Sequence, residues 1–228
     1  GTGHALAVGE RLLRRAADTL IVVSGDTPLL ATATLRSLLA FHRKRKAAAS
    51  VLTADLPDPA AYGRILRDAD GSLAGIVELK AASEEQKRIT EINTGIYCFE
   101  VPALFDALKK VRKNPASGEY YLTDVIELLR KAGRRLAACK APDRDEITGI
   151  NDRAELSRVD SLLRLRKATD LMLAGVTIHS PESVRIDPEV RVNPDTTVEA
   201  GVYLKGKTQI GSGCVVGAYS IKIGRAHV

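Results

Sequence analysis

The chain has 228 residues, of which 45% are apolar and 27% are charged, and its formal net charge at pH 7 is +6. This length allows one large domain or two modest ones, and the composition is that of an ordinary soluble globular protein. No apolar run approaches the ~20 residues that a transmembrane helix needs, and the first residues lack a signal-peptide pattern. We therefore expect a cytoplasmic protein that does not act in a membrane.

The cysteines and the basic residues argue against further classes of site. Cys98, Cys139 and Cys214 lie far apart without a C-x-x-C pair, which argues against a disulfide framework or a zinc site. The densest basic run, His42–Lys46, follows a helix pattern, so its charges complement the helix dipole and lie in water. Few aromatic residues accompany this run, so the net charge suits small phosphorylated anions better than nucleic acid.

The first strand pattern ends in a turn that carries a single carboxylate. Residues Leu20–Val23 are typical of a buried strand, and the residues that follow, Ser24 to Pro28, have turn chemistry. One interpretation is that Asp26 and Pro28 simply suit a turn. The other is that Asp26 binds a metal ion and a phosphate at the carboxyl end of the strand.

Strand and helix patterns then alternate up to about residue 150. A helix is predicted to about Lys46, and a hairpin over Arg64–Glu78 has its turn at Asp68–Gly71. Further strands are predicted in "AASVLTADL", "NTGIYCFEV" and "RRLAACKA", and further helices in "PALFDALKKVRK" and "EYYLTDVIELLRKAG". Strands separated by helices predict a mostly parallel α/β sheet that binds ligands at the carboxyl ends of its strands.

From Asp152 the pattern changes to one long helix followed by a six-residue repeat. Apolar residues at helical spacing continue to Gly175, which predicts an arm helix over 151–175. Aliphatic residues then recur at every sixth position: Ile186, Val192, Val198, Leu204, Ile210 and Val216. This hexapeptide repeat predicts the first coils of a parallel β-helix over 176–222, with about three hexads in each coil.

Both ends of the sequence have unusual features. The repeat fails at Lys222, which occupies the next aliphatic position, and the first residue is not Met. Residues 223–228 match the translation of a common sequencing adapter, so we expect a non-native tail there. The sequence is interpreted as an internal fragment with a nucleotidyltransferase domain at 1–150, followed by the arm helix, the repeat and the tail.

Several motifs, taken together, resemble one bacterial family. In chain order they are "GTGHA", "VVSGDTPLL", "AYGRILRDADGSLAGIVELK", "EINTGIY", "GEYYLTDVI", "GIND" and the hexapeptide repeat. The sequence resembles the bifunctional N-acetylglucosamine-1-phosphate uridylyltransferase/glucosamine-1-phosphate acetyltransferases from Gly1 to about Lys222. The resemblance implies a Rossmann-like nucleotide-sugar pyrophosphorylase domain of the α/β class, an arm helix, and a left-handed parallel β-helix that forms homotrimers.

The resemblance also implies a reaction. The α/β domain is expected to join UTP to N-acetylglucosamine 1-phosphate, giving UDP-N-acetylglucosamine and pyrophosphate. The sugar-phosphate oxygen attacks the α-phosphorus of UTP in line, which depends on positioning and on neutralising charge. The implied cofactor is Mg²⁺, which prefers hard oxygen ligands and keeps several waters. Asp26 and Asn151 match the family's catalytic metal ligands. Asn151 also suits a helix N-cap, although Asp152 could cap the helix instead.

By the same resemblance, two groups of residues bind the substrates. Gly1 and Thr2 match the segment that recognises uracil and ribose, although Gly-Thr-Gly alone is typical of a flexible loop. Ser24 and Gly25 accompany Asp26 along the nucleotide. The residues that match the sugar pocket are Gly63, Glu78, Asn93, Tyr121 and Thr123. Two of these have a structural alternative, since Gly63 also suits a turn with positive φ and Tyr121 suits the core.

Two departures from the family limit what we expect of this chain. The family's glycine-rich phosphate loop precedes "GTGHA" and is absent, so we expect weak or no turnover. The acetyltransferase site belongs to later coils and to a trimer neighbour, so no residue is assigned to it. The alternatives are another sugar-1-phosphate nucleotidyltransferase, for glucose or mannose, and a non-catalytic nucleotide-binding assembly module.

Overall fold

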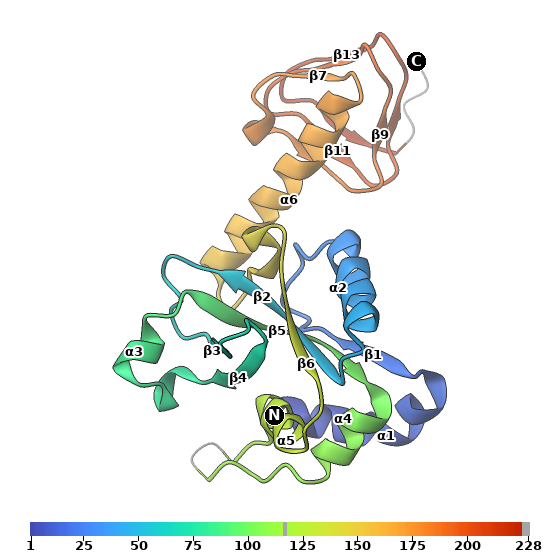
Figure 1. Ribbon diagram of the computed structural model, residues 1–228. Coiled ribbons are helices and arrows are strands. Elements are labelled where there is room, and N and C mark those ends of the chain that lie inside the picture. Colours follow the sequence, from blue (N-terminus) through green and yellow to red (C-terminus); the bar gives the residue numbers. More distant parts are fainter. Residues whose placement is uncertain (116–117, 225–228) are drawn as a thin grey trace. The chain divides into compact units, whose positions relative to one another are not determined.

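The computed structural model describes residues 1–115 and 118–224, which belong to two compact units, Gly1–Gly149 and Ile150–Val228 (Figure 1). Each unit has its own hydrophobic core and is described by itself. Of the predicted non-native tail, Ile223 and Gly224 are described and 225–228 lie outside the described residues. Among the described helices, none has the length and apolar character needed to cross a membrane.

The first unit combines a sheet with helices that alternate with its strands along the chain. Its helices are α1 (Thr2–Ala16), α2 (Thr32–Arg45), α3 (Glu84–Lys87), α4 (Val101–Leu108) and α5 (Thr123–Lys131). Its strands are β1 (Thr19–Val22), β2 (Ala49–Asp55), β3 (Arg64–Arg67), β4 (Leu73–Val77), β5 (Glu91–Glu100) and β6 (Leu136–Lys140), with short 3₁₀ turns η1 (Leu79–Ala81) and η2 (Arg144–Ile147). The predicted β3–β4 hairpin is confirmed by antiparallel pairing from Arg64 to Val77.

The sheet is mixed, so the prediction of a mostly parallel sheet is wrong. The strand order is β4-β3-β5-β2-β6, and β1 also pairs with β5. Strand β5 is antiparallel to β1, β2 and β3, whereas β2 and β6 are parallel. A parallel pair needs a long crossover, and the chain between β2 and β5 instead forms the β3–β4 hairpin, so β5 enters the sheet in reverse.

Strand β5 lies at the centre of this sheet. One of its edges pairs with β2, and the other is shared by β1, at Tyr97–Glu100, and by β3, at Ile92. Between these two partners, at Asn93–Ile96, β1 and β3 part from each other. Along this stretch Asn93, Thr94 and Ile96 are buried and Gly95 is half-buried.

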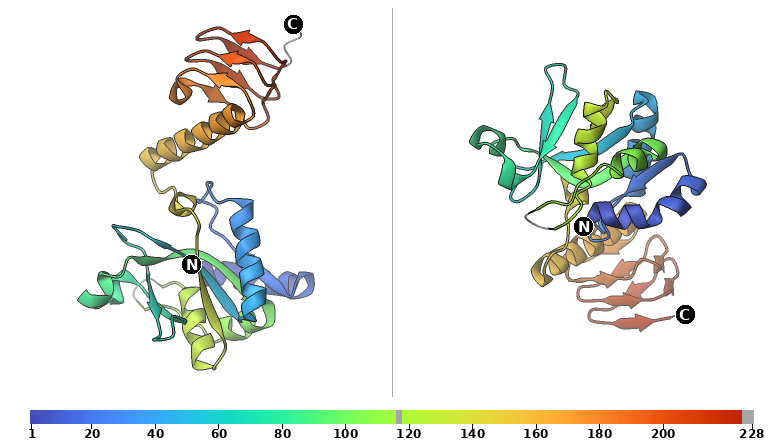
Figure 2. Two further views of the ribbon diagram at one scale, coloured as in Figure 1. Left: turned by 45° about the horizontal axis from the view of Figure 1, so that its top comes forward. Right: turned by 90° about the horizontal axis from the view of Figure 1, so that it is seen from below.

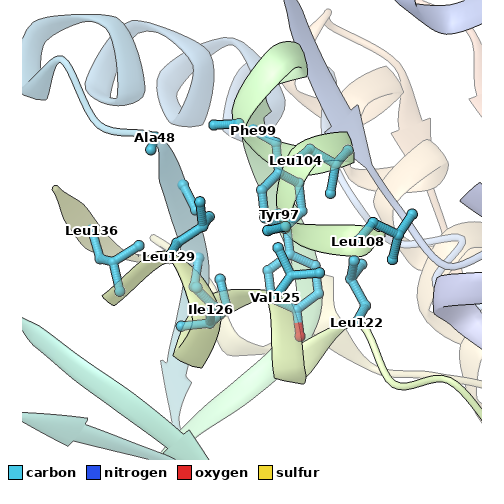
Figure 3. Packing of buried hydrophobic residues seen from close by; sticks show 14 of the residues in the cluster. Ala48, Tyr97, Phe99, Leu104, Leu108, Leu122, Val125, Ile126, Leu129 and Leu136 are labelled. Atoms are coloured by element: carbon cyan, nitrogen blue, oxygen red, sulfur yellow. The ribbon is translucent and has the colours of Figure 1, made fainter. Parts of the chain in front are cut away.

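Helices cover both faces of the sheet, and β5 contributes alternate residues to each face. Tyr97 and Phe99 pack in one cluster with residues of α4 and α5 such as Leu104 and Val125 (Figure 3). Their two rings stack with centroids 5.5 Å apart. On the other face, Ile92, Ile96 and Cys98 pack in a second cluster with Leu38 of α2. The buried apolar side chains of β5 therefore hold the layers together.

The second unit begins with α6 (Arg153–Leu173) and continues as short strands. The Oδ1 atom of Asp152 accepts the backbone N–H of Glu155 at 2.8 Å and caps the helix. Gly175, with φ of +94°, follows the helix end as predicted. The strands are β7 (Thr177–Ile178), β8 (Arg185–Ile186), β9 (Arg191–Val192), β10 (Thr197–Val198), β11 (Tyr203–Lys205), β12 (Gln209–Ile210), β13 (Val215–Val216) and β14 (Ile221–Ile223).

The short strands form three parallel sheets, and within each sheet strands from successive turns of the chain lie side by side (Figure 2). Strand β8 pairs with β11, and β11 pairs with β14, each three hexads further along the chain. The aliphatic side chains of the repeat are buried, and Val198 and Leu204 are completely inaccessible. Lys222 lies opposite Leu204 and is half-buried at the position where the repeat has an aliphatic residue. The hexapeptide pattern thus predicted the inward-facing residues.

Two sequence expectations for the first unit need correction. Of the basic run at the end of α2, Arg43 to Lys46 are exposed as expected, but His42 is buried with Nδ1 2.9 Å from Ser50 Oγ. The helix turns this one position toward β2, whereas the basic side chains beside it face water. Strand β1 is half-buried at every position, because it lies at the edge of the sheet beside β5.

Candidate active site

The loop after β1 holds the first group of predicted site residues. The hydroxyl of Thr27 donates to the carbonyl of Ser24 at 3.0 Å, and the N–H of Leu30 donates to the carbonyl of Thr27 at 3.3 Å. Leu29 is buried and anchors the end of the loop, whereas Ser24, Gly25 and Asp26 are exposed. The turn therefore presents the carboxylate of Asp26 to solvent just beyond the carboxyl end of β1.

Strand β5 contains a bulge next to this loop. The pairing with β2 shifts between Val51, opposite Tyr97, and Thr53, opposite Asn93, so β5 has extra residues there. Thr94 donates its hydroxyl to the carbonyl of Leu52 at 2.7 Å and accepts the N–H of Ile96 at 3.2 Å. These side-chain hydrogen bonds replace backbone hydrogen bonds between β2 and β5 that the bulge disrupts. The residues Asn93, Thr94 and Gly95 thereby change the direction of the strand.

Gly95 brings the bulge and the loop after β1 together. Its φ is +77°, a conformation that glycine adopts without strain. A Cβ atom at this position would lie 3.7 Å from Ser24 Oγ, which is van der Waals contact. The loop after β1 and the strand that carries Asn93 are therefore neighbours.

Three of the predicted sugar-pocket residues meet around the same point of the sheet. The backbone N–H of Asn93 donates to the carbonyl of Gly63 at 2.8 Å. A Cβ atom on Gly63 would lie 3.5 Å from Glu78 Oε2 and 3.2 Å from Ile76 Cγ2. Gly63 does not have positive φ, so that alternative is wrong, and the residue is instead needed where two strands and a carboxylate approach closely.

The first residues of the chain pack against the segment that contains Tyr121. The N–H of Gly3 donates to the carbonyl of Tyr120 at 2.9 Å, and the hydroxyl of Thr2 accepts the N–H of Leu122 at 3.2 Å. Thr2 is the first residue of α1 with Gly1 as its N-cap, so the flexible-loop alternative is wrong. Contacts across the chain thus link Gly1 and Thr2 with the start of α5.

Tyr121 and Thr123 flank the buried Leu122 at this junction. Both side chains are half-buried, and Thr123 is the first residue of α5. Tyr121 is accordingly not a fully buried core residue. Its side chain is partly accessible to solvent.

Asn151 opens the second unit, and its contacts lie within that unit. The carboxylate of Glu155 accepts both its backbone N–H, at 2.6 Å, and its Nδ2, at 3.1 Å. Because Asp152 caps α6, the helix-cap alternative for Asn151 is wrong. Within the described part of the chain, no donor occupies Asn151 Oδ1, and this oxygen is an available ligand atom.

The predicted metal ligands offer the oxygen donors that a hard cation prefers. In the residues that the structure describes, no group of three or more His, Cys, Asp and Glu side chains could hold a metal ion. Mg²⁺ keeps several waters and needs few protein ligands, so one carboxylate and one amide oxygen fit it. Asp26 and Asn151 thus provide oxygen atoms of the kind that Mg²⁺ prefers. The two residues belong to different units of the chain.

Sequence reasoning did not find Tyr97, which contacts the site from within the core. Its hydroxyl accepts a hydrogen bond from Asn93 Nδ2 at 2.8 Å, and its side chain is buried. Burial raises the pKa of Tyr97; the Asn93 hydrogen bond opposes this shift and the charge of Glu78 adds to it. In the sequence, Tyr97 looked like one more apolar position of a buried strand.

A family profile described as nucleotidyl transferase matches residues 1–147, which is more than half of the chain. The chain belongs to the nucleotidyl transferase family. A solved structure from Bacillus anthracis, titled as a candidate glucose-1-phosphate thymidylyltransferase, matches with a TM-score of 0.55 and 23% identity over 72% of this chain and 61% of the other. That likeness supports the Rossmann-like α/β fold alone.

Curated relatives match almost the whole chain at higher identity. The protein named Bifunctional protein GlmU from Enterococcus faecalis is 47% identical over 220 residues, covering 96% of this chain and 48% of the relative. The protein of the same name from Syntrophotalea carbinolica is 50% identical over 218 residues, covering 96% and 47%. The chain therefore spans about half the length of these relatives, and the resemblance to a bifunctional family is confirmed.

Proposed function

We propose that this chain forms the uridylyltransferase part of a bifunctional enzyme, which joins UTP to N-acetylglucosamine 1-phosphate and releases pyrophosphate. The observation that supports it most is the meeting of Gly63, Glu78 and Asn93 beside the loop that carries Asp26. These residues come from four separate segments, and together they provide a carboxylate, an amide and close backbone at one edge of the sheet. The similarity to GlmU proteins over 96% of the chain agrees with this assignment.

The sugar end of the site follows from the chemistry of these side chains. The carboxylate of Glu78 can accept hydrogen bonds from sugar hydroxyls, and the absence of a side chain on Gly63 allows a sugar to approach the backbone. Asn93 can donate and accept at the same sugar. Recognition of this kind orients the phosphate of N-acetylglucosamine 1-phosphate for in-line attack, which is the main contribution a protein makes to such a transfer.

The nucleotide end is formed by loop and helix-start residues. Ser24 and Gly25 lie along the exposed turn, and Gly1 and Thr2 lie beside Tyr121 and Thr123. In this proposal Ser24 and Gly25 lie along the nucleotide beside Asp26, and Gly1 and Thr2 recognise the uracil and the ribose. Tyr121 and Thr123 line the neighbouring sugar pocket. The positive net charge of the chain, +6, favours a substrate that carries a triphosphate.

Asp26 and Asn151 would hold a Mg²⁺ ion in this proposal. When bound, the ion neutralises charge on the phosphates as the bond to the α-phosphorus changes. The carboxylate of Asp26 is exposed, and the Glu155 carboxylate accepts from the Nδ2 of Asn151, which leaves its Oδ1 atom for another partner. Each residue thus has an oxygen to give to a cation.

The second unit has a separate role in the proposal. Its parallel strands and six-residue repeat support a left-handed β-helix, which in the whole protein would assemble three chains and carry the acetyltransferase site. The chain's own residues are assigned no part in acetyl transfer.

The test is a calorimetric titration of nucleotide sugars into variants at both ends of β1. Asp26→Asn should remove the Mg²⁺-dependent gain in affinity for UDP-N-acetylglucosamine, whereas Asp18→Asn, an exposed carboxylate just before β1, should retain it. Glu78→Gln should weaken the binding of UDP-N-acetylglucosamine but not the binding of UDP. Tighter binding of UDP-glucose or GDP-mannose by the unmodified chain would identify a different sugar nucleotidyltransferase. An Asp26→Asn variant that keeps the full Mg²⁺ effect would support a non-catalytic binding module.

A further inference from the structure

The contacts of Asn93 determine the orientation of its side-chain amide, that is, the positions of Oδ1 and Nδ2. The N–H of Gly95 reaches Asn93 Oδ1 at 3.1 Å, and a backbone N–H can only donate. The atom that faces Gly95 must therefore be the oxygen, and the amide nitrogen must face Tyr97, whose hydroxyl lies at 2.8 Å. The buried environment of both side chains makes this orientation costly to reverse.

The same contacts determine the role of Tyr97. Since Asn93 Nδ2 donates, the phenolic oxygen of Tyr97 accepts, and this oxygen is the partner that the structure gives to that amide nitrogen. Tyr97 is held in turn by the core: it is 3% exposed and its ring stacks on Phe99. A hydroxyl fixed by core packing thus holds the amide of a residue on the β5 bulge.

We propose that Tyr97 is a positioning residue, which fixes the side-chain amide of Asn93 for recognition of the sugar through the Asn93 Nδ2–Tyr97 hydroxyl hydrogen bond. This inference rests on the proposed function, because it assumes that Asn93 contacts the sugar. It adds a residue from inside the core to a site otherwise made of loop and strand-end residues. Tyr97 itself does not need to touch the substrate.

The variant Tyr97→Phe tests the role with little change to packing. It removes the hydroxyl, keeps the ring against Phe99 and leaves a buried amide N–H without its acceptor. We expect about tenfold weaker binding of UDP-N-acetylglucosamine in calorimetric titration, with the affinity for UDP changed less than about twofold. Tyr203→Phe, in the second unit, is the matched control and should change neither affinity.

A double-mutant cycle separates positioning from general damage to the fold. In a chain that already carries Asn93→Ala, Tyr97→Phe should have no further effect on UDP-N-acetylglucosamine, because the amide through which it acts is gone. An unchanged affinity in Tyr97→Phe would overturn the inference, and so would a full additional loss in the Asn93→Ala background. Failure of the unmodified chain to bind UDP-N-acetylglucosamine would instead overturn the proposed function, and the inference with it.

Discussion

The carboxylate of Glu146 accepts a hydrogen bond from the backbone N–H of Ala31, with 3.1 Å between Oε2 and the nitrogen. Ala31 is the N-cap of α2, and an alanine side chain cannot satisfy the N–H groups of a first helical turn. Glu146 is buried and lies in η2, far along the chain. This contact joins the segment before Gly149 to the end of the loop that carries Asp26.

Removing this carboxylate should destabilise the first unit. Glu146→Ala should lower the free energy of unfolding by about 1 kcal/mol, which is typical of a lost helix cap, and Glu146→Gln should lower it less because an amide oxygen can still accept. Urea denaturation followed by circular dichroism measures both. Glu127→Ala, which removes an exposed glutamate of α5, is the control and should change little. Equal stabilities of the unmodified chain and Glu146→Ala would contradict this role.

A second buried carboxylate belongs to Glu91, the first residue of β5. Arg67 donates to both oxygens of Glu91, at 2.7 Å from Nε and 2.6 Å from Nη2, and the hydroxyl of Thr53 donates to Oε1 at 2.6 Å. Arg67→Ala leaves this carboxylate without its cation, so we expect a loss of about 2 kcal/mol at pH 7. Arg36→Ala, an exposed arginine of α2, serves as the control.

The loss in Arg67→Ala should depend on pH. Burial acts to raise the pKa of Glu91, but the hydrogen bonds from Arg67 and Thr53 outweigh it and hold the pKa below its ordinary value of 4.5. A depressed pKa contributes stability that is present above pH about 4.5 and is lost as the pH falls through the folded-state value. The difference between the two chains should therefore shrink below pH 4.5. A difference that stays constant to pH 3 would argue that Arg67 acts by packing alone.

His42 gives a second pH-dependent prediction. Burial lowers the pKa of His42 below its ordinary value of 6.5, Glu100 acts to raise it, and Arg43 lowers it further. The unfolded chain therefore binds a proton at a higher pH than the folded chain, and stability should decrease as the pH falls below 6.5. Thermal unfolding between pH 7.5 and 5 should show this slope, and His42→Gln should reduce it. The slope should persist in His4→Gln, an exposed histidine of α1.

Gly95 should tolerate a side chain poorly. Alanine at φ of +77° is strained, so Gly95→Ala should destabilise the first unit by about 1 kcal/mol and should weaken UDP-N-acetylglucosamine binding by distorting the bulge. Gly75→Ala, on β4, does not face this penalty: its φ is not positive, and no described atom lies within 4 Å of the added Cβ. Equal stability and affinity in the two variants would show that the bulge accepts other conformations.

Local patterns predicted the parts of the fold that depend on local chemistry. The β3–β4 hairpin followed from its turn residues, and the buried positions of the second unit followed from a period of six. The direction of β5 could not be predicted in this way, because it depends on whether the connecting chain crosses the sheet. The order of strand and helix patterns along the sequence carries no information on that crossing. The helix α1 was missed because "GTG" lacks a capping side chain and has two residues that disfavour helices.

Site residues at the ends of strands could be predicted from the sequence. Residues that support the site from within the core could not. Asp26, Glu78 and Asn93 are polar residues beside apolar runs, and such residues are visible in a sequence. Tyr97 lies four residues after Asn93, a spacing that makes contact only because the bulge adds residues to β5. Local propensity allowed either Asn151 or Asp152 to cap α6, and the structure has Asp152 as the cap.

The most direct test of the central claim is a calorimetric titration of UDP-N-acetylglucosamine into the purified chain, with and without Mg²⁺. The account predicts binding that Mg²⁺ strengthens, and a loss of that gain in Asp26→Asn and in Asn151→Ala. No binding by a chain that circular dichroism shows to be folded would contradict it. Binding that is indifferent to Mg²⁺ would contradict the assignment of the two metal ligands.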